Sequence, residues 1–249
     1  MLNINIDKLK KLDSSTSEAY KRLRTNIQFC GSDVKVIALT STIPNEGKSS
    51  VSFNLAASIA ESGKKVIFID ADLRKSVLVG RYKINKAVKG FTHYLSGVNA
   101  FDEVVYSTNV DNLHVVFSGP VPPNPAELLG NKYFKTLIKQ LRQSYDYIII
   151  DTPPIGSVID AAIVAEECDG VVMVVASGEI SYRFVQKTKE QLDQANCRIL
   201  GVVLNKVPMG KSGYYGHYYG NYYGRYYGHY GKYGSYGNYG NYGQSSKKS

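Results

Sequence analysis

The sequence has no tryptophan and only three cysteines in 249 residues. Cys30, Cys168 and Cys197 are scattered along the chain, their number is odd, and none has the spacing of a zinc or redox motif. This argues against a disulfide framework and against a cysteine-based metal site. We therefore expect reduced thiols and a cytosolic protein.

Long hydrophobic runs are also missing. No apolar stretch approaches the ~18–20 residues that a membrane-spanning helix requires. The start, MLNINIDKLKKLDSS, has no apolar h-region of a secretory signal. We expect neither a membrane span nor a cleaved leader, although a hydrophobic share of 43% is enough for a sizeable core.

Acidic and aliphatic residues are absent from residues 210–249. Glycine recurs there at every fourth and then every third position, so the segment cannot form a core, and we expect a flexible tail. The net charge of the whole chain is +9. A basic excess of this size permits a membrane surface or nucleic acid as neighbour and establishes neither.

The tail contains thirteen of the 21 tyrosines of the chain. Glycines separate them so that each phenol is accessible, which suits a substrate better than a packing element. The alternative is a low-complexity segment that stacks on RNA bases or self-associates, and a single arginine in the tail weakens it. The candidate phosphoacceptors are Tyr214, Tyr215, Tyr218, Tyr219, Tyr222, Tyr223, Tyr226, Tyr227, Tyr230, Tyr233, Tyr236, Tyr239 and Tyr242.

Residues 39–50, LTSTIPNEGKSS, have the pattern of a phosphate-binding loop between a strand (34–40) and a helix (49–62). Glycine allows a tight turn of inward N–H groups, the lysine supplies charge for the β/γ-phosphates, and the serine hydroxyl is a magnesium ligand. The alternative is a plain strand–helix turn with an exposed lysine. The candidate nucleotide contacts are Thr42, Pro44, Asn45, Glu46, Gly47, Lys48, Ser49 and Ser50, with threonine at the usual first-glycine position.

Acidic residues follow two further hydrophobic segments. Asp70 and Asp72 come after the strand predicted at 65–70, and Asp151 after that at 147–150. Carboxyl ends of parallel strands are where ligands bind, and an acid there helps to hold Mg²⁺. We assign Ser49, Asp72 and Asp151 to the metal and Asp70 to the phenol proton, and the two roles of Asp70 and Asp72 could be reversed. A surface turn rich in Asp is the alternative.

Strands and helices alternate through the rest of the chain. This predicts an α/β fold in which helices cover both faces of a parallel sheet. Asn124, Pro125 and Glu127 predict a capped helix running to about residue 142. Asn205 ends the last predicted strand as a purine contact or a cap. The expected parts are residues 1–30, an arm and a helix; 31–209, the nucleotide-binding domain; and 210–249, the tail.

Together these segments resemble the bacterial tyrosine kinases of capsular and exopolysaccharide biosynthesis. The family's first motif is similar to residues 41–49, including the non-glycine at Thr42 and the proline at Pro44. Its D-x-D-x-R motif matches residues 70–74, and its aliphatic-D-x-x-P motif matches residues 148–154. The GPVPPNPAELL block, residues 119–129, is similar to a stretch that the family also carries.

The resemblance implies an ATP- and Mg²⁺-dependent protein-tyrosine kinase that phosphorylates its own tail, transferring phosphate between neighbouring subunits. It implies a ring joined by an E-x-x-R-x-x-R helix, here Glu18, Lys21 and Arg24, where lysine replaces the first arginine and loses its bidentate fork. A solvated helix face is the other interpretation of these charges.

The resemblance also implies partners and a location. They are a separate transmembrane activator, a tyrosine phosphatase and the polysaccharide assembly machinery, at the inner face of a bacterial membrane; nucleic acid is not expected. Two alternatives remain: a partitioning or division-site ATPase and a tyrosine-rich scaffold. Those ATPases carry a signature lysine where this chain has Ile43, and they lack a tyrosine tail.

Overall fold

The computed structural model describes residues 2–4, 6, 12–82, 84 and 88–208. The predicted tail, with all thirteen candidate acceptor tyrosines, lies outside the described residues. Within them the strands are β1 (Leu2–Ile4), β2 (Val36–Ser41), β3 (Val66–Asp70), β4 (Val105–Thr108), β5 (Leu113–Val116), β6 (Tyr147–Asp151), β7 (Gly170–Ala176) and β8 (Ile199–Asn205). The α-helices are α1 (Ser14–Phe29), α2 (Lys48–Glu61), α3 (Leu78–Arg81), α4 (Phe91–Leu95), α5 (Pro125–Leu129), α6 (Lys132–Ser144), α7 (Asp160–Ala165) and α8 (Tyr182–Gln194).

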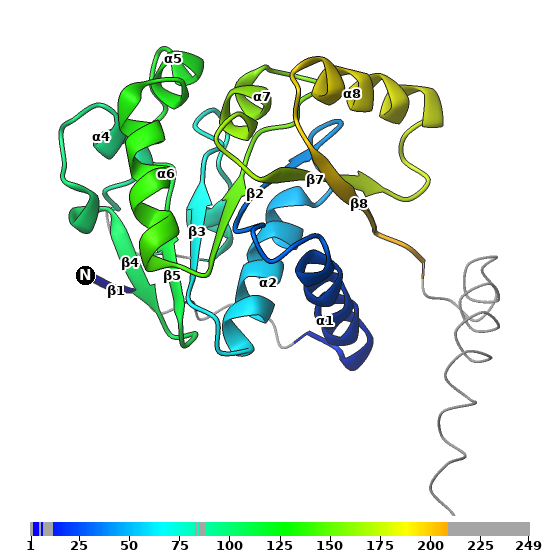
Figure 1. Ribbon diagram of the computed structural model, residues 1–249, viewed down its shortest axis with the longest axis horizontal. Helices are drawn as coiled ribbons and strands as arrows, with labels where there is room; N and C mark the ends of the chain where they lie inside the picture. Colours follow the sequence, from blue (N-terminus) through cyan, green and yellow to red (C-terminus); the bar gives the residue numbers. More distant parts are fainter. Residues whose placement is uncertain (1, 5, 7–11, 83, 85–87, 209–249) are drawn as a thin grey trace, which may run out of the picture. The chain divides into compact units, whose positions relative to one another are not determined.

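The strands form one sheet in the order β1-β4-β5-β3-β6-β2-β7-β8. All neighbouring strands are parallel except β4 and β5, which are antiparallel. The predicted α/β class is therefore confirmed. Two features differ from the prediction: the antiparallel pair, and strand β1, which pairs with β4 at the edge of the sheet although its residues were expected in an arm (Figure 1).

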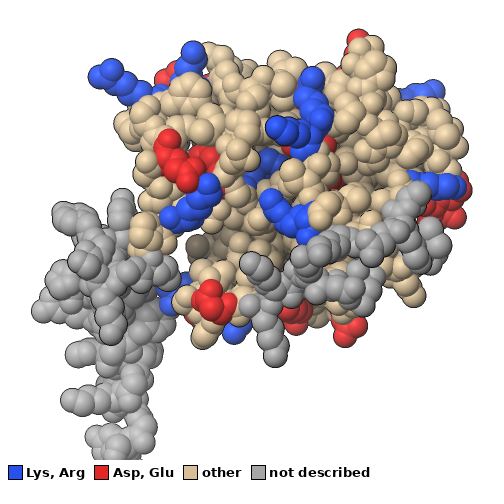
Figure 2. All heavy atoms as spheres, turned by 180° about the vertical axis from the view of Figure 1, so that it is seen from behind, with Lys and Arg blue, Asp and Glu red and all other residues tan. Residues whose placement is uncertain are grey.

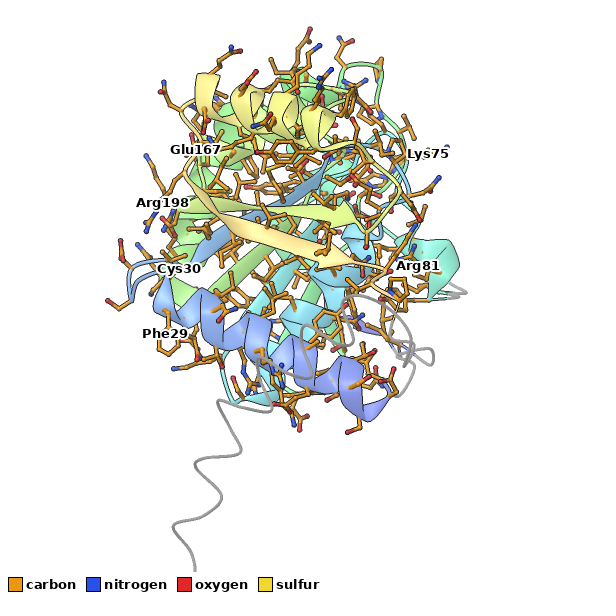
Figure 3. The ribbon with its side chains drawn as sticks, turned by 90° about the vertical axis from the view of Figure 1, so that its right-hand side faces the viewer. Phe29, Cys30, Lys75, Arg81, Glu167 and Arg198 are labelled. Atoms are coloured by element: carbon orange, nitrogen blue, oxygen red, sulfur yellow. The ribbon has the colours of Figure 1, made fainter. Side chains whose placement is uncertain are left out.

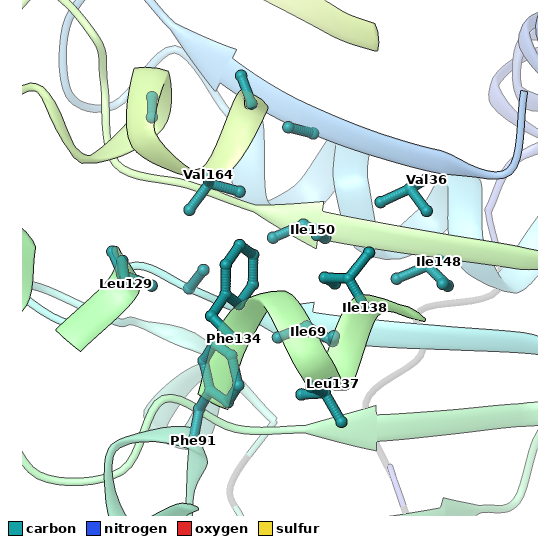
Figure 4. Packing of buried hydrophobic residues seen from close by; sticks show 14 of the residues in the cluster. Val36, Ile69, Phe91, Leu129, Phe134, Leu137, Ile138, Ile148, Ile150 and Val164 are labelled. Atoms are coloured by element: carbon teal, nitrogen blue, oxygen red, sulfur yellow. The ribbon is translucent and has the colours of Figure 1, made fainter. Parts of the chain in front are cut away.

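Helices cover both faces of the sheet (Figure 1). Successive side chains of a strand point to opposite faces, so each buried strand contributes to two cores. In β2, Val36 and Ala38 pack in the core under α4, α5, α6 and α7, whereas Ile37 and Leu39 pack in the core under α1 and α2. Figure 4 shows the first core, in which the rings of Phe134 of α6 and Phe91 of α4 meet edge to face with their centroids 6.0 Å apart.

The predicted helix from Asn124 to about residue 142 is two helices. α5 ends at Leu129, and Asn131 starts α6 by accepting the backbone N–H groups of Tyr133 and Phe134. An asparagine in this position is a strong helix start, so the chain begins a new helix rather than extending the first. The predicted capping box is also wrong, because the Asn124 amide donates to the Glu127 carboxylate and makes no bond to the helix backbone.

Among the described residues, no helix has the length and apolarity needed to cross a membrane.

Phe134 provides a test of the core. Its side chain is completely buried, so Phe134→Ala should lower the free energy of unfolding by about 3–5 kcal/mol. Phe29→Ala is the matched control because Phe29 is 83% exposed, and it should change the unfolding free energy by less than about 0.5 kcal/mol. Urea titration measures both variants, and equal effects would contradict the assigned packing.

Candidate active site

The phosphate-binding loop and the predicted acids meet at one edge of the sheet. β6 lies between β2 and β3, and in its register Asp151 is opposite both Leu39 and Asp70. Since these strands are parallel, their carboxyl ends coincide. Figure 3 shows Lys75 and Arg81 on the side toward which β7 and β8 point, and Cys30 and Arg198 on the opposite side.

The loop has the backbone conformation that its glycine predicts. Gly47 has φ 87° and Asn45 has φ 70°, both in the left-handed region. α2 starts directly afterwards at Lys48, so the N–H end of the helix faces the same loop. Pro44 and Asn45 are exposed, while Ser49 and Ser50 are half-buried in the first turn of the helix.

The buried side chain of Glu46 stabilises the loop by accepting backbone hydrogen bonds. Its buried carboxylate accepts the backbone N–H groups of Thr42 at 2.7 Å, Ile43 at 2.9 Å and Ala176 at 3.0 Å. Three such bonds satisfy a buried carboxylate, and they tie the loop to the end of β7. The Glu46 side chain therefore shapes the loop, and Thr42 donates its N–H to this carboxylate.

Asn205 also contacts the loop. Its side-chain amide donates to the Glu46 carbonyl oxygen at 2.8 Å, which is the capping alternative considered from the sequence. A Cβ atom on Gly47 would lie 2.1 Å from the Asn205 amide nitrogen. Glycine is thus required at position 47 both for its positive φ and for the close approach of the end of β8.

Lys48 and Asp151 form a buried ion pair. The Lys48 ammonium donates to Asp151 Oδ1 at 2.7 Å and to Ser49 Oγ at 3.2 Å, and the Ser52 hydroxyl donates to the same Asp151 oxygen at 2.8 Å. Asp151 Oδ2 is buried without a hydrogen-bond partner among the described residues. Ser52 has no part in the sequence motif, and only the turn of α2 brings it to Asp151.

The residues present fit a magnesium ion held jointly with a nucleotide. No cluster of three or more His, Cys, Asp or Glu side chains able to hold a metal occurs in the described part of the chain. Mg²⁺ is usually bound by one or two carboxylates together with phosphate oxygens and water. The unpaired Asp151 oxygen and the nearby Ser49 hydroxyl match that limited set of protein ligands.

Asp70 and Asp72 occupy different environments. Asp70 is fully buried and accepts the Ser76 hydroxyl and, at 3.3 Å, the Asp72 N–H. Burial and the neighbouring Asp151 charge raise the pKa of Asp70 to about 7. Asp72 is also buried, although 9% of it is exposed, and it accepts the backbone N–H groups of Arg74 at 3.3 Å and Lys75 at 3.0 Å.

The arginine of the D-x-D-x-R motif has a partner that the sequence analysis missed. Arg74 donates through Nε and Nη2 to the two carboxylate oxygens of Asp160, at 2.8 and 2.9 Å. The hydrogen bonds to Asp160, and then the negative charge of this carboxylate, raise the pKa of Arg74. Asp160 is the first residue of α7, is completely buried and lies 86 positions further along the chain, so no local motif indicated it.

A pocket of about 380 Å³ adjoins the acids. It contains Asp72 and Arg74 together with Lys75 and Ser76. The face seen in Figure 2 carries several Lys and Arg side chains across its middle. The site therefore combines acidic groups suited to a metal with basic groups suited to phosphate.

The predicted oligomerisation residues lie on α1. Glu18 and Lys21 form an exposed ion pair with a nitrogen–oxygen distance of 3.7 Å. Arg24 donates through Nη1 to the Ser58 carbonyl oxygen of α2 at 2.7 Å, so its guanidinium binds within the same chain. The ring therefore remains a prediction.

The comparisons with known proteins agree with these motifs. A family model described as an AAA domain matches residues 34–199. The tyrosine-protein kinase CpsD of Streptococcus agalactiae is 48% identical over 202 residues, which cover 81% of this chain and 88% of that protein. The chain belongs to the bacterial tyrosine-protein kinases. The resemblance inferred from its motifs, and the tyrosine kinase activity that it implied, are thereby confirmed.

Solved structures support the same assignment of this kinase. The kinase domain of the Escherichia coli tyrosine kinase ETK is 32% identical with a TM-score of 0.78, covering 86% of this chain and 84% of that one. The chimerical protein CapA2B2 is 34% identical with a TM-score of 0.75, covering 82% and 89%. Nucleotide binding follows from membership of this family.

Gly47→Ala should weaken nucleotide binding by the kinase, because the new Cβ displaces the Asn205 amide from the loop and the backbone there has a positive φ. Gly63→Ala is the matched control: its φ is 85°, but nothing lies within 4 Å of the added Cβ. We expect Gly63→Ala to retain ATP affinity while losing about 1 kcal/mol of stability. Fluorescent-nucleotide titration and thermal melting separate the two, and normal binding by Gly47→Ala would contradict the described loop.

Proposed function

We propose that this kinase transfers the γ-phosphoryl group of Mg-ATP to the tyrosines of its own residues 210–249 and thereby regulates capsular or exopolysaccharide biosynthesis and export. The observation that carries the proposal is the meeting of Lys48, Ser49, Asp70 and Asp151 at one sheet edge. The acceptors are proposed from the tyrosine spacing of the tail and from the family resemblance.

Charge neutralisation is the main task of the loop. Phosphoryl transfer passes through a loose transition state, so positioning and electrostatics matter more than a strong base. We assign the backbone N–H groups of residues 45–49 and the Lys48 ammonium to the β/γ-phosphates. In the described structure this ammonium is held by Asp151. A bound nucleotide would compete with Asp151 for this ammonium, and Asp151 would then be available to hold the metal.

The carboxylates complete the assignment. Ser49, Asp72 and Asp151 would hold Mg²⁺ directly or through water, and the bound ion would supply positive charge to the phosphate oxygens. We assign Asp70 as the group that accepts the proton of the tyrosine phenol. Its burial and its contact with Ser76 support a role different from that of the more accessible Asp72. The reverse assignment of the two acids is the alternative that kinetics must exclude.

The proposed setting is the inner face of a bacterial membrane. A separate transmembrane activator, a tyrosine phosphatase and the polysaccharide assembly machinery are the proposed partners, and a ring of identical subunits is the proposed assembly. Family resemblance supports each of them. The net charge of +9 is compatible with an anionic membrane surface as neighbour.

Incubation with Mg-ATP followed by an anti-phosphotyrosine blot tests the activity. Full-length protein should be labelled, and protein lacking residues 210–249 should lose the label. An ATPase switch would hydrolyse ATP without forming phosphotyrosine, and a scaffold would do neither.

Lys48→Met should reduce phosphotyrosine labelling about 1000-fold, since it removes charge stabilisation. Asp70→Asn should cost only about 10- to 100-fold, because a carboxylate base acts late on a phenol. Equal, complete losses would identify Asp70 as a metal ligand.

Mixing two defective proteins tests transfer between subunits. Lys48→Met protein retains its tail but cannot transfer phosphate, whereas protein lacking residues 210–249 has an intact site but no acceptor. We expect phosphotyrosine on the tail of the Lys48→Met protein in the mixture and none in either protein alone. An unlabelled mixture would contradict transfer between neighbours and leave transfer within one subunit.

A further inference from the structure

The guanidinium of Arg74 is held in place by Asp160 and still has N–H groups that can donate hydrogen bonds. Nε and Nη2 are bound to the buried Asp160 carboxylate, while the Arg74 side chain is 40% exposed. Within the part of the chain that the structure describes, Nη1 makes no hydrogen bond. Because a bidentate pair sets the plane of the guanidinium, the free edge of the fork is oriented before any ligand arrives.

Arg74 also lines a pocket whose lining residues are partly basic and partly apolar. Arg74 and Lys75 line it together with the hydroxyl-bearing Ser118. Val79, Val88 and Val121 form an apolar part of the same lining. A pocket that is basic in one part and apolar in another suits a ligand with an anionic group on a hydrophobic ring.

We propose that this pocket binds phosphotyrosine, the aryl phosphate produced by the reaction. The phenyl ring packs against the valines. The phosphate dianion accepts hydrogen bonds from Arg74 Nη1 and is attracted by the positive charge of the Lys75 ammonium. The volume of about 380 Å³ accommodates such a side chain. The inference rests on the proposed function in one respect, since phosphotyrosine in the tail is that function's product.

Asp160 is the positioning residue of this site. It balances the single positive charge of the arginine, so Arg74 contributes the geometry of its fork and Lys75 supplies the net positive charge. Asp72 lines the pocket too and accepts the Arg74 backbone N–H, which places the pocket next to the acids of the transfer site. A phosphorylated tail held there delays the entry of the next tyrosine, and phosphorylation then limits itself.

A binding assay without nucleotide tests the proposal, so that its result does not depend on kinase activity. The full chain, treated with phosphatase, is titrated into a fluorescent peptide of residues 232–243 phosphorylated at Tyr236. Anisotropy should show about tenfold tighter binding than for the unphosphorylated peptide. Phenyl phosphate should displace the peptide more effectively than inorganic phosphate. Equal affinity for both peptides, or equal competition by both phosphates, would overturn an aryl-phosphate site.

The decisive variant is Arg74→Gln with Asp160→Asn. Changing both residues avoids a buried unpaired carboxylate. It should weaken phosphopeptide binding about tenfold while ATP-analogue affinity stays within about twofold. Lys189→Gln with Asp193→Asn is the matched control, since it removes an exposed ion pair of α8 and should change neither affinity. Unchanged phosphopeptide binding would overturn the proposal, and an equal loss of ATP binding would assign Arg74 to the nucleotide instead.

Arg74→Lys provides a second route if the double variant melts early. The lysine keeps the charge beside Asp160, but one ammonium cannot bridge a carboxylate and a phosphate as a fork does. The same loss of phosphopeptide affinity is expected, and full affinity in Arg74→Lys would overturn the role of the fork. Absence of phosphotyrosine after incubation of the unmodified kinase with Mg-ATP would count against the proposed function and leave this binding result standing.

Discussion

The buried charge of Asp151 is the constraint on which the site depends. It lies at the end of β6, in the middle of the sheet, and its ion pair with Lys48 and bond from Ser52 join β6 to α2. A buried carboxylate is costly unless it is paired. The arrangement therefore fixes the start of α2, and with it the loop, relative to the neighbouring strand. The second oxygen of Asp151 has no hydrogen-bond partner among the described residues.

Two further buried carboxylates extend the same principle. Glu46 satisfies three N–H groups and connects the loop to β7, while Asp160 holds Arg74 and connects the D-x-D-x-R segment to α7. Each is completely buried, so each depends on a specific set of donors. These two acids therefore shape the backbone around the site.

Most of the element pattern followed from hydrophobic periodicity and end signals. α2, β3 and β6 were each predicted within one residue at either end. These segments have strong local signals. The edge of the sheet was harder: β1 is three residues long, and its pairing with β4 brings together positions about a hundred residues apart. No local pattern specifies such a pairing.

The sequence by itself determined the family, the phosphate-binding loop and the acids after β3 and β6, because these lie in contiguous motifs whose spacing is set by one turn of backbone. Only the tertiary structure decided what each polar side chain contacts. Glu46 was predicted as a nucleotide contact and Asn205 as a purine contact or a cap, and the structure shows both bonded to the loop, whereas Ser52 and Asp160 were not expected at all. The reason is physical: a buried polar group is satisfied by whichever partner the packing brings within about 3 Å, and that partner is commonly distant in sequence.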